Sequence, residues 1–171
     1  MPNFKEEYLM SEKMKYGVVE TSKIRATYMG GGHVFSVVDN DAALENGMIV
    51  ALGDPIDTYG NEEYKALTPT KSDAVVLIAD VPLVYDQSTT VAQAEYNYVN
   101  EIGKSTRAYT LQPRDMYAVS EYLITKATGT TVTDGNLIVA KDRKYQEVAK
   151  ATDVSAYGFV AKVRYTYIKA V

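Results

Sequence analysis

The stretch ALENGMIVALGD at residues 43–54 decides the fold, because VTDGNLIVAKDR at residues 132–143 repeats its pattern. Each copy places a favoured two-residue turn, Asn-Gly or Asp-Gly, before the strand-forming sequence Ile-Val-Ala. Neither copy carries a nucleophile, a set of metal ligands or a phosphate-binding loop. The repeat therefore predicts an architectural unit that is used twice for its shape.

The repeat extends beyond the turn. The first copy continues through EEYKALTP at residues 62–69 and SDAVVLIADV at 72–81, and the second through KYQEVAKA at 144–151 and SAYGFVAKV at 155–163. We interpret each copy as a three-strand meander, in which a hairpin is followed by a returning strand. Two copies are too few for a solenoid, but each meander can cover the apolar face of the other in a sandwich or a small barrel.

The predicted fold is therefore mainly β: a single-domain β-sandwich or small barrel built from two related meanders, with one short helix and an extended N-terminal arm. The abundance of tyrosine, 15 residues, agrees with this class because tyrosine suits pleated, half-buried surfaces. If the repeat is genuine, Ile49 and Ile138 occupy equivalent positions in one shared core.

Several single segments are also predictable. The most apolar run, Val75 to Ile78, does not alternate and so predicts a central strand that is covered on both faces. Pairing should weaken at Pro82, which has no N–H to donate. In the closing strand, every second residue is expected to face the core: Phe159, Ala161, Val163, Tyr165 and Tyr167.

Three further elements lie outside the repeat. Ile24 to Met29 and His33 to Val38 predict two strands, separated by three glycines. The helix is expected within residues 89–103, where Thr90 and Gln93 have capping-box spacing and Gly103 suits a helix C-terminus.

The composition excludes several kinds of site. The chain of 171 residues has no cysteine, so disulfides, thiolate metal sites and cysteine nucleophiles are excluded. The net charge of -4 does not indicate binding to nucleic acid or to an anionic membrane, because both are negatively charged and attract positively charged proteins. Because no apolar run reaches the length of a signal peptide or a membrane span, we expect the protein to be made and kept in the cytoplasm.

The charge is unevenly distributed along the chain. Residues 1–103 contain 7 Lys and Arg against 16 Asp and Glu, a net of -9, whereas residues 104–171 contain 11 against 6, a net of +5. This asymmetry suits the docking of neighbouring copies, or of a second protein, through complementary fields. It is equally compatible with ordinary solvated charge on both halves.

Candidate catalytic residues are few. His33, the only histidine, follows three glycines and is interpreted as a strand-start residue rather than a general base. No Lys-Ser or Lys-Thr follows these glycines, so they do not predict a phosphate-binding loop. Asp39-Asn40-Asp41 with Glu45 lacks the glycine and the distal glutamate of a calcium loop and is interpreted as a polar turn. We predict no enzyme activity, and no catalytic, metal-binding or cofactor-binding residues.

Tyrosines offer a possible binding surface. A stacking platform for sugars would be the basis of a carbohydrate-binding module, and its candidates are Tyr96, Tyr98, Tyr109, Tyr117 and Tyr122. The chain has no tryptophan, the best such platform, and a tyrosine-lined protein interface is the competing interpretation.

The chain is divided into an N-terminal arm, residues 1–22, and a β-rich domain, residues 23–171. The arm mixes charges with apolar side chains such as Phe4, Tyr8 and Leu9, and it has no convincing helix cap. It either orders on a partner or packs loosely on its own domain.

Three strings carry a resemblance to a known family: NGMIVALGD at residues 46–54, GKSTRAYTLQPRDMYAVSE at 103–121 and YGFVAKVRY at 157–165. In this order they resemble the capsid decoration, or cement, proteins that tailed bacteriophages of Gram-positive hosts encode beside the major capsid gene. The resemblance covers residues 23–171 and not the arm. It implies a non-enzymatic virion structural protein that binds the outer surface of the capsid and ties its subunits together against internal DNA pressure.

The resemblance also implies the partners. These are the major capsid protein and, as a further option, the protein itself as a homo-oligomer, with neither nucleic acid nor membrane. The expected location is the capsid exterior of the virion, after synthesis in the host cytoplasm. Arg107 and Tyr109 are interpreted as structural residues of the GKSTRAYTL element rather than as contacts.

Capsid binding is assigned to Phe4, Tyr8 and Leu9 of the arm. Deleting residues 1–22 is therefore expected to weaken binding without unfolding the domain. Two alternative functions stay open, a phage tail-tube or fibre-associated structural subunit and a carbohydrate-binding β module.

Overall fold

The computed structural model describes residues 15–28, 33–58, 61–71, 73–83, 95–129 and 131–164, and strands dominate them. The strands are β1 (Val19–Glu20), β2 (Val34–Val38), β3 (Ile49–Thr58), β4 (Asn61–Leu67), β5 (Val75–Ile78), β6 (Thr106–Thr110), β7 (Ala118–Val119), β8 (Ile124–Thr125), β9 (Leu137–Lys141), β10 (Lys144–Val148) and β11 (Val160–Lys162). Helix in this part of the chain is limited to α2 (Arg25–Tyr28) and the 3-10 turns η1 (Glu95–Asn97) and η2 (Glu121–Leu123). The prediction of a mainly β fold is confirmed.

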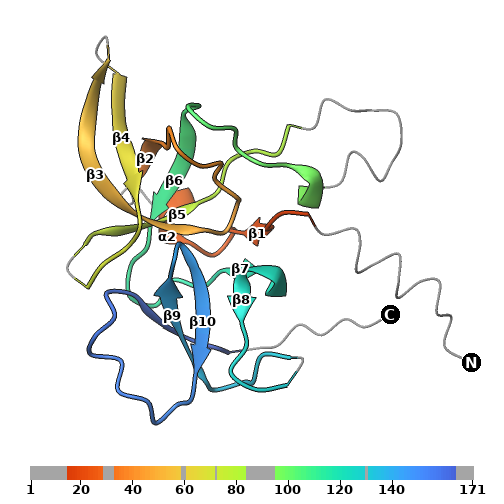
Figure 1. The fold of residues 1–171 in the computed structure, drawn as a ribbon. Helices are drawn as coiled ribbons and strands as arrows, with labels where there is room; N and C mark the ends of the chain where they lie inside the picture. Colours follow the sequence, from red (N-terminus) through yellow and green to blue (C-terminus); the bar gives the residue numbers. More distant parts are fainter. Residues whose placement is uncertain are drawn as a thin grey trace, which may run out of the picture.

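Five strands close into a small barrel in the order β2-β4-β3-β5-β6 (Figure 1). β3 and β4 form a long hairpin, β5 pairs antiparallel with β3, and β6 pairs antiparallel with β5. β2 closes the barrel, because it pairs antiparallel with β6 and parallel with β4. Closure satisfies strand edges that an open sheet would leave unpaired.

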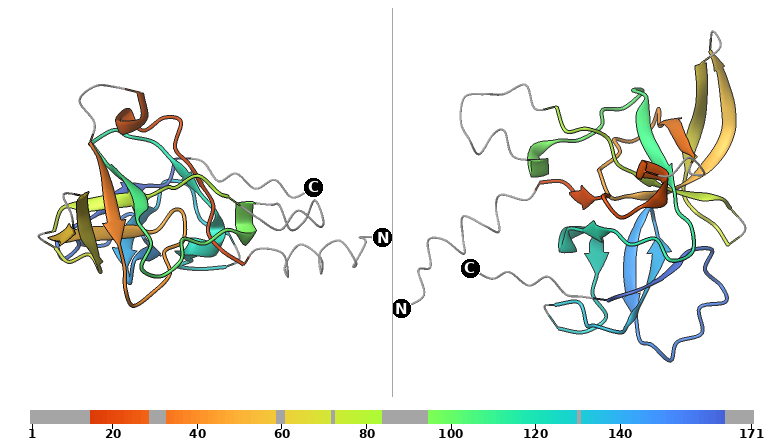
Figure 2. Two further views of the ribbon diagram at one scale, coloured as in Figure 1. Left: turned by 90° about the horizontal axis from the view of Figure 1, so that it is seen from above. Right: turned by 180° about the vertical axis from the view of Figure 1, so that it is seen from behind.

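A second, four-stranded sheet lies beside the barrel, with the order β11-β9-β10-β8 (Figures 1 and 2). Its strands pair antiparallel except for β8, which runs parallel to β10. A two-stranded sheet of β1 and β7 lies near the boundary between these two units.

The two copies of the repeat form meanders of the same topology. In the first, β3 lies between β4 and β5, and in the second, β9 lies between β10 and β11. Ile49 pairs with Leu77 of the first returning strand, and Ile138 pairs with Ala161 of the second. Both isoleucines belong to one buried hydrophobic cluster, which confirms the predicted shared core. The copies differ in their neighbours, because β2 and β6 close only the first meander into the barrel.

Strand β5 is buried on both faces, as its unbroken apolar run predicts. Val76 and Ile78 lie on one face and Leu77 on the other, and all three side chains are 0% exposed. β5 ends before Pro82, and Val81 beside this proline is 53% exposed. The central strand of the prediction is therefore correct, but its ladder pairing already stops at Ile78, before Pro82 is reached.

The tip of the β9–β10 hairpin joins the second sheet to the barrel. Asp142 and Arg143 have positive φ angles of 49° and 66°, as a tight two-residue turn requires. The Arg143 carbonyl accepts a hydrogen bond from the Ile49 N–H at 3.0 Å. The Arg143 guanidinium forms an ion pair with Asp39 and donates to the Ala66 carbonyl at 3.1 Å. One side chain and its backbone thus contact three parts of the barrel region.

Tyr145 of β10 reinforces this junction. Its ring lies 6.5 Å from that of Tyr117 and 6.3 Å from that of Phe159, and its hydroxyl donates to the Gly47 carbonyl at 2.7 Å. Burial raises the pKa of the Tyr145 and Tyr117 hydroxyls well above the ordinary value. Both hydroxyls therefore keep their protons and remain available as hydrogen-bond donors.

The closing strand alternates as predicted in its described part. Phe159, Ala161 and Val163 pack against the core cluster, whereas the intervening residues are exposed. Tyr165 and Tyr167, which were predicted to continue the inner face, lie outside the described residues.

The helix predicted within residues 89–103 is wrong over its described part. Of residues 95–103, only Glu95–Asn97 is helical, and as a 3-10 turn. Asn100 instead pairs with Leu44, with N–H to carbonyl bonds of 3.0 and 2.9 Å in the two directions. This contact joins residues far apart in the sequence, and it replaces the local hydrogen bonds that a helix would make.

The strand predicted from Ile24 to Met29 is also wrong, because residues Arg25–Tyr28 form α2. Ile24 is 0% exposed, and its carbonyl accepts bonds from the Thr27 N–H at 3.1 Å and the Thr27 hydroxyl at 2.6 Å. The threonine side chain thus stabilises a turn where the β-branched composition suggests a strand. The second predicted run, His33 to Val38, corresponds to β2.

Candidate functional site

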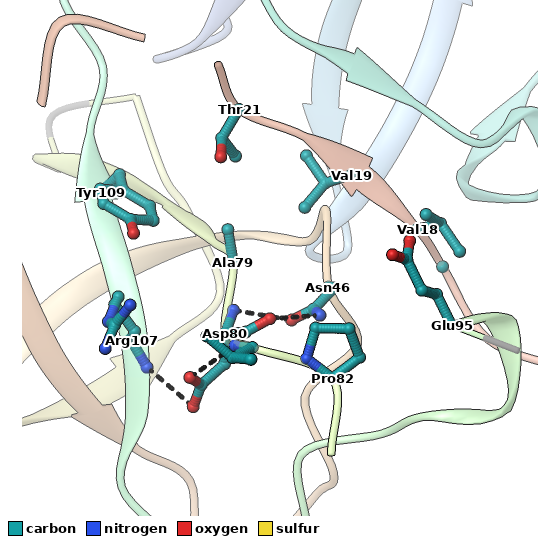
Figure 3. Close-up of a pocket in the computed structure, with 12 residues that line it drawn as sticks. Val18, Val19, Thr21, Asn46, Ala79, Asp80, Pro82, Glu95, Arg107 and Tyr109 are labelled. Carbon is teal, nitrogen blue, oxygen red and sulfur yellow. Dashed lines mark hydrogen bonds between the residues drawn. The ribbon is translucent and has the colours of Figure 1, made fainter. Parts of the chain in front are cut away.

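A polar pocket of about 220 Å³ lies beside β6, between the end of β5 and the first described residues of the chain (Figure 3). Arg107 and Tyr109 project into it from β6, and Asp80 lies next to them on the segment that follows β5. Glu95 of η1 and the segment Gly17 to Val19 line the opposite side. The pocket thus combines both signs of charge with residues from five separate segments, the fifth being Asn46.

The alternation of β6 places Arg107 and Tyr109 on the outer face of the barrel. Thr106 and Ala108 are 1% and 0% exposed, so they occupy the inner face. Arg107, between them, and Tyr109, after Ala108, must then point outwards. Arg107 pairs in register with Ser36 of β2. The alternation of TRAYT therefore directs two of the lining side chains of the pocket outwards.

Asn46 fixes the segment that carries Asp80. Its amide nitrogen donates to the Asp80 carbonyl at 2.9 Å, and its amide oxygen accepts from the Asp80 N–H at 3.0 Å. The Asn100 amide donates to the same Asn46 oxygen at 3.2 Å and to the Leu44 carbonyl at 2.8 Å. Asn46 and Asn100 are buried, so these hydrogen bonds replace the ones that their amides would make with water. They also hold the backbone of the pocket in place.

Arg107 supplies a permanent positive charge. The adjacent Tyr109 hydroxyl, and to a lesser extent the Asp80 carboxylate, raise the pKa of the guanidinium above its ordinary value. The Asp80 carboxylate itself accepts the N–H of Val81 at 2.8 Å and the backbone N–H of Arg107 at 3.5 Å. The Arg107 side chain is exposed and so can meet a group from outside the protein.

A second hollow, of about 370 Å³, shares Asp80 and Arg107 with the first and is otherwise lined by β2 and Ser105. Val34 lines the second hollow and is 51% exposed, while Val81 lines the first and is 53% exposed. Apolar side chains therefore stand beside both hollows. We call the surface formed by Val34, Asp80, Val81, Arg107 and Tyr109 the Arg107 face.

The described residues of the predicted arm contact the domain beside this face. Val19–Glu20 pairs with Ala118–Val119, and the Val18 N–H donates to the Ser120 hydroxyl at 3.2 Å. The Tyr16 N–H donates to the Tyr96 carbonyl at 3.0 Å. We call residues 16–20 the arm base, and its backbone is held by hydrogen bonds to separate segments of the domain.

Gly17 and Glu45 complete the arm base. The Gly17 N–H donates to Glu45 Oε2 at 2.8 Å, and Lys144 of β10 pairs with Glu45 Oε1 at 3.3 Å. A Cβ atom at residue 17 would lie 2.5 Å from the Asn46 carbonyl oxygen, so this approach requires glycine. Glu45 thereby links the arm base to the second sheet.

The residues predicted from the sequence fall in different places. Phe4, Tyr8 and Leu9, the predicted capsid contacts, lie outside the described residues. His33 is exposed immediately before β2, where its carbonyl accepts bonds from Thr110 and its ring stacks on Phe35 at 6.1 Å. It belongs to strand pairing, as expected of a strand-start residue.

The acidic segment at Asp39 forms the polar turn that was predicted. The Asp39 carboxylate accepts the N–H groups of Asp41 at 2.8 Å and Ala42 at 3.1 Å and pairs with Arg143. Among the described residues, no group of three or more His, Asp or Glu side chains is placed to hold a metal ion. In the same part of the chain, no helix is long and apolar enough to cross a membrane.

The five candidate tyrosines do not form one platform. Tyr117 packs against the core cluster, Tyr122 lies under the Lys144 ammonium at 4.8 Å, and Tyr109 lines the pocket. The Tyr98 hydroxyl donates to the Asn100 side chain at 2.9 Å. A sugar-stacking surface built from all five is therefore not present.

The sequence interpretation assigned Arg107 and Tyr109 a structural role within GKSTRAYTL and did not place them in a pocket. The available signal was the alternation of TRAYT, which places both side chains on one face. The pairing of Asn46 with Asp80, 34 residues away, had no such signal. Comparisons with protein-family models, with curated proteins and with solved structures found no match to this chain.

Proposed function

We propose that the protein is a non-enzymatic virion structural protein that binds the outer surface of a phage capsid and stabilises it. The observation that carries the proposal concerns the segment at residues 103–121, the longest string that resembles capsid decoration proteins. This segment supplies Arg107 and Tyr109 on the outer face of β6, and also β7 and Ser120, which hold the arm base. One string thus builds both an exposed surface and the anchor of the arm.

The architecture supports a role in binding a large surface. A closed barrel and a second sheet share one core, and the hairpin tip at Arg143 ties the second sheet to the barrel. Such a body changes little on docking, so it loses little conformational entropy. When many copies bind one shell, their individually modest contacts together stabilise the shell strongly.

The proposed partner is the major capsid protein, and the proposed location is the capsid exterior, with Phe4, Tyr8 and Leu9 among the contacts. The test is cosedimentation of the purified protein with expanded shells assembled from the major capsid protein of the phage that encodes it. Full-length protein should bind to a fixed stoichiometry, and deletion of residues 1–14 should weaken binding. No binding by the full-length protein would refute the proposal.

The deletion ends at residue 14 for a structural reason. The sequence interpretation placed the arm at residues 1–22, but Gly17 and Val19–Glu20 contact the domain directly. Removing Gly17 and Val19–Glu20 would disturb the fold. A loss of binding could then not be distinguished from a loss of structure. Light scattering from the protein alone distinguishes the tail-tube alternative, which requires rings or filaments to form without shells.

A further inference from the structure

We propose that the Arg107 face docks a segment of the partner protein in which an aspartate or glutamate stands between apolar side chains. The inference rests on the proposed function and deepens it, because it assigns a second contact with the capsid shell to the domain itself. The occupant is an extended protein segment, and its carboxylate meets the Arg107 guanidinium.

The charge of Arg107 is available for such a contact. The ion pairs among the described residues include Arg25 with Asp115 and Arg143 with Asp39, but none to Arg107. Both oxygens of the nearby Asp80 carboxylate accept backbone N–H groups instead. A guanidinium presents five N–H donors in a planar fork that matches a carboxylate in bidentate geometry. Arg107 therefore has donors to offer to an incoming carboxylate.

The apolar side chains of the partner segment have sites beside the charge. Val34 lines one hollow and Val81 the other, and Arg107 lines both. Each valine exposes about half of its surface, at 51% and 53%, so docking removes apolar area from water. When a segment binds across Arg107, its carboxylate therefore meets the guanidinium, and the apolar side chains on either side of the carboxylate meet the two hollows.

The Arg107 face has the composition and the fixed backbone of a binding hot spot in a protein interface. Arginine and tyrosine are enriched among residues whose truncation costs most binding energy, and Arg107 and Tyr109 stand side by side. The double hydrogen bond between Asn46 and Asp80 holds the backbone in place before a partner arrives. This preorganisation lowers the entropic cost of binding.

The arm base lines the same pocket, so the two proposed contacts reinforce each other. Gly17, Val18 and Val19 form part of the pocket wall. A partner held by residues 1–14 is therefore kept close to the Arg107 face, which raises the effective concentration of the second contact.

Two matched pairs of variants test the inference by cosedimentation with the same shells. Arg107→Glu is paired with Arg164→Glu, which makes the same charge change at an exposed arginine after β11. Val81→Asp is paired with Val160→Asp, since Val160 is also an exposed valine, at 41%. Arg107→Glu and Val81→Asp should weaken shell binding by about tenfold or more, and the two controls by less than about twofold.

The outcomes separate this inference from the proposed function. Full-length protein that fails to bind shells overturns both. Binding of Arg107→Glu and Val81→Asp at the level of their controls overturns the inference alone. Urea unfolding of each variant confirms that it is folded, and Arg107→Gln replaces Arg107→Glu if the latter is not.

A photocrosslinking residue at position 34 identifies the occupant. Crosslinked peptides of the major capsid protein that contain an acidic residue among apolar ones support the inference. Crosslinks to a second copy of this chain, or to capsid peptides without an acidic residue, contradict it. The same crosslinker at position 160 is the matched control and should give no shell-dependent product.

Discussion

Arg143 links the second sheet to the barrel through an ion pair with Asp39 and a hydrogen bond to Ala66. Its side chain is only 20% exposed and its partner Asp39 only 5%. Burial raises the pKa of Asp39, but the N–H groups of Asp41 and Ala42 and the Arg143 charge outweigh it, so the net pKa is lowered. The aspartate therefore stays ionised and relies on these donors.

Replacing Arg143 with alanine should destabilise the protein by about 3 kcal/mol, because the buried Asp39 carboxylate loses its counter-charge. Urea unfolding at neutral pH measures this loss. Arg164→Ala is the matched control, an exposed arginine whose removal should cost less than about 0.5 kcal/mol. Equal stabilities for the two variants would show that the ion pair does not hold the junction.

Glu147 is a second buried carboxylate, at 2% exposure, and it organises the turn before β9. It accepts the N–H of Thr133 at 2.8 Å, the amide of Asn136 at 2.7 Å and the N–H of Ala127 at 3.1 Å. Burial raises the pKa of Glu147, but these donors together lower it below the ordinary value of 4.5.

This lowered pKa predicts a loss of stability in acid. The folded state binds the Glu147 proton less tightly than the unfolded state, so its contribution is complete above the unfolded pKa of 4.5 and is lost as the pH falls through the folded pKa. Glu147→Gln should be less stable than the wild type at neutral pH, with a smaller decline below about pH 4.5. Urea unfolding at a series of pH values measures both effects, and parallel declines in the two proteins would contradict this assignment.

At the scale of elements, the arm base sets where the chain can be shortened. Deletion of residues 1–14 keeps every described bond of the arm base and should cost less stability than deletion of residues 1–22. Deletion of residues 1–22 removes the bonds of Tyr16, Gly17 and Val18 to the domain and should cost about 3 kcal/mol. Thermal unfolding of the two proteins checks this difference. Equal midpoints would mean that the arm base contributes nothing to the fold.

The elements that could be predicted from the sequence are those in which the order of apolar and polar residues, or a turn dipeptide, indicates the local structure. β5 is an unbroken apolar run, β11 alternates, and the turns before β3 and β9 carry the signals Asn-Gly and Asp-Gly. β1 could not be predicted, because two residues give no period. The helix predicted within residues 89–103 is wrong over its described part, residues 95–103, because Asn100 bonds to Leu44 and Asn46, which local capping rules do not consider.

The candidate site was less predictable than the fold. Strand alternation places Arg107 and Tyr109 outwards, but Asp80 also lines the pocket. Asp80 is held there by a hydrogen bond to Asn46, which lies 34 residues earlier in the sequence. Such contacts depend on how the barrel closes, and no local pattern encodes them. Closure itself requires β2 to pair with β4 in parallel, a pairing that a series of hairpins does not suggest.

At the scale of the whole molecule, the barrel and the second sheet share one hydrophobic cluster. Ile49 of β3 and Ile138 and Tyr145 of the second sheet all belong to it. A shared core of this kind couples the two units, because neither can open without exposing the apolar surface of the other.

We therefore expect a single cooperative unfolding transition. Far-UV circular dichroism, which follows the strands, and near-UV circular dichroism, which follows the tyrosines, should give coincident urea curves. Tyr145→Phe removes the bond to the Gly47 carbonyl and should shift both curves together by about 2 kcal/mol. Two separate transitions in the wild type would show that the sheets unfold independently.

The arm base also determines how the molecule bears mechanical load. A tension that enters at residue 15 divides between η1 through Tyr96, the turn before β3 through Glu45, and β7 through Ser120. Because Glu45 is also paired with Lys144, part of this tension continues into the second sheet. The pull is therefore not borne by the short β1–β7 ladder alone, which would peel apart one bond at a time. It is shared by bonds of Tyr16, Gly17 and Val18, each to a separate part of the domain.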